Sequence, residues 1–117
     1  MENLSKLFKI LSDPTRLRIV EILMVEDLCV CELMFVLKLE QSRVSHQLRR
    51  LREAKLVEKR KHGKWVIYNI SEDVQRTLKP LLGKHVKSEN IRTLKIHRRL
   101  ANLKNKLRNE IRKKRIE

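Results

Sequence analysis

Glycine and proline are scarce in this sequence, which contains two of each among its 117 residues. So little of either residue argues against a loop-rich fold and excludes a glycine-rich loop that would cradle a phosphate. No apolar run comes near the roughly 20 residues that a membrane span requires, and the first residues show no secretory signal pattern. The sequence also pairs no nucleophile with a base. We therefore expect a cytoplasmic protein that is not an enzyme.

Positive charge is what the sequence has in abundance. Lys and Arg number 29 against 14 Asp and Glu, which gives a formal net charge of +15 and a pI near 10.4. This charge indicates a polyanionic partner, with nucleic acid the first candidate and an anionic membrane surface the second. Residues 88–117 alone hold 11 Lys and Arg and three Glu. At this length we expect one domain, residues 1–87, followed by a basic tail, residues 88–117.

Helical patterns fill the first part of the chain. Apolar residues at three- and four-residue spacing over Leu4–Leu11 predict a first helix of about ten residues. Asp13 followed by Pro14 is typical of the start of a second helix. Asp caps free backbone N–H groups, and Pro suits the first helical position because its missing N–H is not needed there. A short third helix is predicted from Val30 to Leu37.

The segment from Gln41 to Ala54 has one apolar stripe, and its other positions are polar and mostly basic. A short helix, a tight turn and a second helix with a basic outer face are typical of a helix-turn-helix, which inserts its second helix into the major groove of DNA. We expect this helix to contact base edges through Gln41, Ser42, Arg43, Ser45 and His46 and phosphates through Arg49 and Arg50.

A β-hairpin is predicted next, with Gly63 at its turn, and a further helix from Glu72. The basic tip of the hairpin is expected to contact a phosphate backbone or the minor groove through Arg60, Lys61, His62 and Lys64. The predicted fold is mainly α with a small β-hairpin. It is a winged helix-turn-helix of order α-α-α-α-β-β-α with a C-terminal basic helical extension.

The tail has an apolar pattern of its own. Ile96, Leu100, Leu103 and Leu107 follow spacings of four, three and four, as in an amphipathic helix or a coiled-coil seam. Three roles stay open for this tail. It contacts flanking phosphates, extends a dimer through the seam, or packs back on its own domain.

Cys29 and Cys31 form the chemically interesting pair. In a reducing compartment a Cys-x-Cys pair indicates a ligand or redox pair before a structural disulfide, and the alternative is two small buried hydrophobic residues. Within a regular helix these side chains point about 200° apart, so two thiolates meet one ion only if the turn distorts. A helix N-terminus would also favour the thiolate over the thiol.

Four segments in this order resemble the ArsR/SmtB family of metal-responsive repressors: Asp13–Ile19, Leu28–Leu33, Gln41–Leu48 and Gly63–Tyr68. The resemblance covers roughly residues 3–84. It implies a winged-helix homodimer that binds double-stranded operator DNA. It also implies that a metal or metalloid weakens this binding. It further implies that the first helix and the helix from Glu72 form the dimer interface.

The resemblance also implies candidate ligands. Cys29 and Cys31 correspond to the thiol ligands of arsenic-responsive members, but Met34 occupies the position of their third Cys. Other members bind Zn(II) on the dimer-interface helix, where this chain has Asp73, His85 and Glu89 without the second His. We therefore expect solvated charges there rather than a zinc site.

The leading hypothesis is a cytoplasmic, nucleoid-associated repressor that needs no cofactor and no membrane. Its operator DNA is released when As(III), Sb(III) or another soft ion binds Cys29 and Cys31. The competing hypothesis is a constitutive or architectural DNA-binding protein, or a redox-sensing regulator, with no metal inducer.

Overall fold

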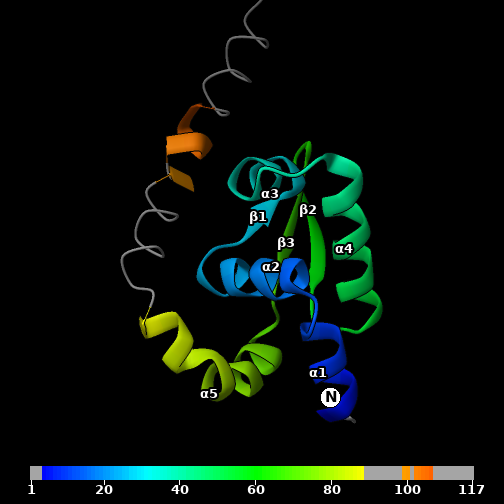
Figure 1. The fold of residues 1–117 in the computed structure, drawn as a ribbon. Helices are drawn as coiled ribbons and strands as arrows, with labels where there is room; N and C mark the ends of the chain where they lie inside the picture. Colours follow the sequence, from blue (N-terminus) through cyan, green and yellow to red (C-terminus); the bar gives the residue numbers. More distant parts are fainter. Residues whose placement is uncertain (1–3, 89–98, 101, 107–117) are drawn as a thin grey trace, which may run out of the picture.

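The computed structural model describes residues 4–88, 99–100 and 102–106, and Figure 1 shows the arrangement of their helices and strands. The elements in chain order are α1 (Leu4–Leu11), α2 (Pro14–Val25), β1 (Leu28–Cys29), α3 (Val30–Leu37), α4 (Gln41–Glu53), β2 (Glu58–His62), β3 (Trp65–Asn69) and α5 (Glu72–Ser88). The mainly helical fold with a small hairpin is as predicted, and α3 has the predicted bounds. No helix in the described ranges is long and apolar enough to cross a membrane.

The predicted start of α2 is confirmed. Asp13 has extended backbone angles, and its Oδ2 accepts a hydrogen bond of 2.9 Å from the backbone N–H of Arg16. Pro14 takes the first helical position, where no backbone donor is required. This cap fixes the residue from which α2 runs toward the core.

The sheet has three strands in the order β1-β3-β2, and both pairings are antiparallel. Gly63 closes the β2–β3 turn with a φ of +64°, a region that glycine enters without strain. The predicted element order lacked β1 and was wrong there. This strand has two residues, Leu28 and Cys29, which pair with Tyr68 and Ile67. Two residues are too few for an alternating pattern to reveal them.

One apolar core joins the helices to the sheet. Its fully buried side chains come from α2, β1, α3, α4 and α5 and include Ile19, Leu23, Leu28, Leu33, Leu48 and Leu78. From β3, Tyr68 is also buried. Helix α4 contributes only its predicted stripe to the buried core, and its remaining positions are exposed except for Gln47 and Arg52, which are partly buried.

The described part of the tail packs on its own domain. Leu100 is 1% exposed and belongs to the same core cluster as α2 and α4. Lys104 forms an ion pair with Glu26, the residue that ends α2. Of the three roles left open by the sequence, this packing supports the third. Ile96 and Leu107 lie outside the described residues.

Replacing Leu100 with alanine tests this packing. We expect Leu100→Ala to lower the free energy of unfolding by about 2–5 kcal/mol, because truncating a fully buried leucine leaves a cavity. Urea denaturation at one fixed protein concentration measures the change. Leu103→Ala is the matched control, since Leu103 is only partly buried and should cost less. Equal and negligible losses in both variants would contradict the packing.

Candidate nucleic-acid interface and thiol pair

Helix α4 separates its side chains into an apolar face and a polar face. Val44, Leu48 and Leu51 are 0–1% exposed. All seven side chains predicted to contact DNA are exposed: Gln41, Ser42, Arg43, Ser45, His46, Arg49 and Arg50. His46 Nδ1 and Arg49 Nη2 lie 3.3 Å apart, one turn from each other. The structure therefore brings the predicted residues of α4 together on one solvent-facing surface.

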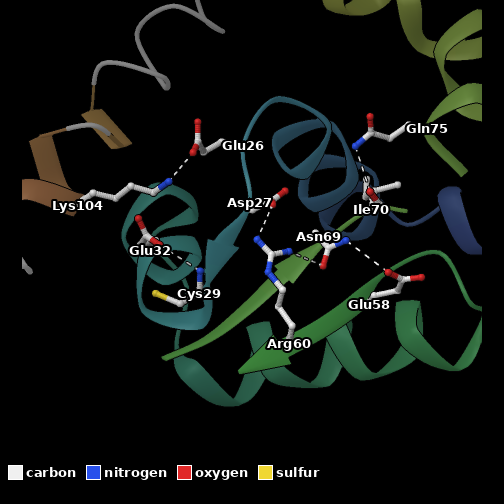
Figure 2. A network of polar contacts seen from close by, with 10 residues as sticks. All are labelled: Glu26, Asp27, Cys29, Glu32, Glu58, Arg60, Asn69, Ile70, Gln75 and Lys104. Atoms are coloured by element: carbon white, nitrogen blue, oxygen red, sulfur yellow. Dashed lines mark hydrogen bonds and ion pairs between the residues drawn. The ribbon is translucent and has the colours of Figure 1, made fainter. Parts of the chain in front are cut away.

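The four basic residues predicted for the hairpin tip are also exposed, but they differ in their contacts. Arg60 donates to Asp27 Oδ2 at 3.0 Å and to Asn69 Oδ1 at 3.1 Å, and Asn69 in turn contacts Glu58. Figure 2 shows this network across the sheet. The side chains of Lys61, His62 and Lys64 form no hydrogen bond or ion pair with another described residue. Of the four residues predicted for the tip, these three therefore have side chains open to a partner.

The two cysteines occupy different kinds of backbone. Cys29 ends β1 and is the N-cap of α3, with φ −89° and ψ 168°, whereas Cys31 lies in the first turn of that helix. The 200° separation expected within a regular helix does not apply to this pair, because pairing with Ile67 of β3 holds Cys29 extended. Cys29 is 5% exposed, Cys31 is exposed, and both thiols are free.

Glu32 holds the junction between β1 and α3. Its Oε1 accepts a hydrogen bond of 3.1 Å from the backbone N–H of Cys29, and the Cys29 side chain faces the N–H of Glu32 in return (Figure 2). This reciprocal arrangement is a capping box with Cys in the usual place of Ser or Thr. Glu32 is 3% exposed, and its Oε2 has no hydrogen-bond partner among the described residues. The sequence analysis missed Glu32, although the three-residue spacing from Cys29 would have indicated it.

Burial raises the pKa of the Cys29 thiol from its ordinary 9.0 to about 12. The hydrogen bond from the Glu32 backbone opposes this rise, while the Glu32 carboxylate and Cys31 add to it. The expectation that the helix N-terminus favours a thiolate is therefore wrong for Cys29. Desolvation of the charged form outweighs the helix dipole there, so Cys29 is a thiol at neutral pH.

A model described as "Bacterial regulatory protein, arsR family" matches residues 13–59. The arsenical resistance operon repressor of Escherichia coli K12 is 39% identical over 97 residues, which cover 82% of this chain and 83% of that protein. The chain belongs to the ArsR family. A SmtB-homologue repressor of Synechocystis is 40% identical over 72 residues, and the match spans 62% of this chain and 54% of that relative.

Solved structures of ArsR-type regulators share this fold. The winged helix-turn-helix DNA-binding domain of a Mycobacterium bovis protein, described as homodimeric, matches with a TM-score of 0.61 and 27% identity. The match covers 74% of this chain and 80% of that domain. The winged helix-turn-helix prediction is thus confirmed. These relatives are regulatory proteins, in agreement with the expectation that the chain is not an enzyme.

Of the remaining candidate ligands, the structure describes the side chains of Met34 and Asp73. Met34 is half-buried against the core. Asp73 forms an ion pair of 2.8 Å with Arg76 on α5. The side chain of His85 and the whole of Glu89 lie outside the described residues. Within the described part of the chain, no group of three His, Cys, Asp or Glu side chains is placed to hold a metal ion.

Thiol modification tests the different environments of the cysteines. At pH 8 we expect a maleimide to modify Cys31 roughly tenfold or more faster than Cys29, because Cys29 is buried and protonated. Mass spectrometry of Cys29→Ser and Cys31→Ser, each with one thiol, measures the two rates. The rate at Cys29 should keep rising above pH 10, toward its pKa of about 12. Equal rates in the folded variants would contradict this assignment, and equal rates in urea serve as the control.

Proposed function

We propose that this ArsR-family protein is an operator-binding transcriptional repressor whose dimer releases DNA when a thiophilic metal or metalloid ion binds Cys29 and Cys31. The observation that carries the proposal is the exposed polar and basic face of α4 beside the basic wing. The thiol pair lies at the start of α3, the helix that packs against α4. The name of the Escherichia coli relative supports arsenite as the first inducer to test, with antimonite second.

In this proposal α4 and the wing contact different parts of the DNA. Polar side chains near the N-terminus of α4 suit base edges in the major groove, where hydrogen bonds distinguish the base pairs. Arg49, Arg50 and the cations of the wing suit phosphates, which supply affinity and position the helix. Arg60 contributes less than the other wing residues in this proposal, since Asp27 already neutralises it.

The proposed dimer interface is formed by α1 and α5. Leu4 and Phe8 of α1 are 60% and 53% exposed, and Leu81 of α5 is 47% exposed. Large apolar side chains exposed on these two helices are costly in water and favour burial against a second copy. The Mycobacterium bovis domain, described as homodimeric, supports dimerisation itself.

The proposed switch uses the unlike positions of the two thiols. Exposed Cys31 is accessible to an ion, whereas Cys29 is held by β1–β3 pairing and by Glu32. An ion that bridges both sulfurs must bring them to one point, which the capping box opposes. Binding at both thiols therefore loosens the first turn of α3, and the packing of α3 on α4 transmits the change to the DNA-contacting helix.

The residues present fit a thiophilic ion only in part. Cys29 and Cys31 supply two soft sulfur donors, which thiophilic ions prefer. The third-thiol position is Met34, which packs against the core. A third donor from water, a cellular thiol or the partner subunit completes the proposed coordination.

A non-inducible DNA-binding protein is the second candidate function. The burial of Cys29 and its raised pKa favour it, because a buried thiol commonly serves as a small hydrophobic residue. In that case the basic tail and wing supply affinity, and binding depends strongly on salt with little sequence preference.

Substitutions on the two DNA-contacting elements should have different effects. Lys61→Ala should weaken binding to operator and unrelated DNA alike and reduce the slope of log affinity against log salt by about 1. Arg43→Ala should instead reduce the preference for operator by about 1–3 kcal/mol. Fluorescence anisotropy at several salt concentrations measures both quantities. Arg76→Ala removes the same charge from α5 and should change neither. Unaltered binding in Arg43→Ala would argue against base contact by α4.

The switch itself is tested by titrating arsenite into the protein bound to its own upstream DNA under reducing conditions. We expect the anisotropy to fall to that of free DNA for the wild-type protein and to stay unchanged for the Cys29→Ser, Cys31→Ser double variant. Retention of DNA by the wild-type protein would exclude arsenite as the inducer. Release from both proteins would show that the thiols are not the sensor.

A further inference from the structure

Arg16 contacts three separate parts of the chain from the first turn of α2. Its backbone N–H donates to the Asp13 cap, as described above. Its side-chain Nε donates to the backbone oxygen of Ile10 at 2.8 Å, and its Nη1 donates to Gln47 Oε1 at 3.1 Å. Arg16 is partly buried, so both side-chain bonds are shielded from water.

The two side-chain bonds connect Arg16 to α1, a helix of the proposed dimer interface, and to α4, the helix proposed to contact DNA. Ile10 lies in the last turn of α1, where carbonyl groups lack intrahelical partners and a cation is favourable. Gln47 lies in α4, next to the exposed His46, but is itself partly buried. The guanidinium therefore forms a polar link from α1, through α2, to α4. Gln47 is turned toward this link rather than toward the DNA-contacting face.

Because hydrogen bonds are directional, these two bonds can fix the rotation of α4, which apolar packing alone does not fix. Burial of the α4 stripe is non-directional and tolerates small rotations of the helix about its axis. A hydrogen bond weakens steeply once its angle departs from linearity, so the Arg16–Gln47 bond resists such a rotation. Because Gln47 directly follows His46, the same rotation would move His46 and its neighbours relative to the bases.

We propose that Arg16 is a positioning residue for operator binding, which fixes the rotation of α4 relative to α1 through Gln47 without touching DNA. The inference rests on the proposed function of operator binding. It adds a connection between the helix assigned to the dimer interface and the helix assigned to the DNA. In a dimer, the link sets the angle at which two copies of α4 meet successive major grooves.

A double-mutant cycle on operator DNA tests the link. Arg16→Ala and Gln47→Ala should each weaken operator binding about tenfold. The double variant should bind no more weakly than Arg16→Ala alone, because Arg16→Ala already removes the one bond that Gln47→Ala removes. The slope of log affinity against log salt should stay at the wild-type value in all three. A direct phosphate contact by Arg16 would instead lower that slope by about 1.

The matched control is Arg18→Ala, which removes the same charge from the same helix. Arg18 forms an ion pair with Glu21 at 3.8 Å within α2, so its effect should add to that of Gln47→Ala. Thermal unfolding of each variant separates loss of fold from loss of position. If Arg16→Ala does not fold, Arg16→Lys replaces it in the same cycle, since lysine keeps the charge and loses the forked geometry.

The outcomes are distinct. Additive losses from Arg16 and Gln47, or wild-type binding by Gln47→Ala, would overturn the positioning role while leaving operator binding intact. A reduced salt slope in Arg16→Ala would replace it with a direct contact to DNA. Failure of the wild-type protein itself to prefer operator over unrelated DNA would overturn the proposed function and the positioning role together.

Discussion

Burial of the apolar stripe of α4 is the constraint on which the rest of the molecule depends. Three side chains, Val44, Leu48 and Leu51, are almost completely removed from water. Each such burial contributes about 1.5–3 kcal/mol, so turning the helix over would cost most of a domain's stability. The polar positions of α4 are consequently forced outward together, and a surface for DNA results from the packing of the core.

The ion pairs of the described residues lie away from that surface, so acidic side chains do not cover it. Ion pairs among the described residues join Arg60 with Asp27, Lys104 with Glu26, and Arg76 with Asp73, all away from α4. Acidic partners thus neutralise cations that hold the sheet, the tail and α5. By contrast, Arg43, Arg49 and Arg50 of α4 and Lys61 and Lys64 of the wing have no acidic partner among the described residues. A protein with net charge +15 resists compaction by self-repulsion, and a polyanion relieves it where the positive side chains are unpaired.

The sequence predicted what depends on local pattern and missed what depends on distant contacts. The spacing of apolar residues predicted the bounds of α3. It placed the end of α4 at Ala54, one residue beyond the observed end at Glu53. The strand at Leu28–Cys29 exists only because β3 pairs with it, about 40 residues further along the chain. The Arg16–Gln47 bond joins residues 31 positions apart, and the sequence around neither residue predicts it. The pKa of Cys29 likewise follows from a burial that β1 creates.

The short strand β1 also changes how the thiol pair bears on DNA. Cys29 is bonded into the sheet opposite Ile67, in the strand that forms one side of the wing, while Cys31 belongs to α3. The capping box of Cys29 and Glu32 fastens these two elements together. A force that brings the two sulfurs together must therefore displace the wing strand, the first turn of α3, or both. Each of them supports part of the surface that α4 and the wing present, so a small movement at one junction would reach both elements of the proposed DNA-binding surface.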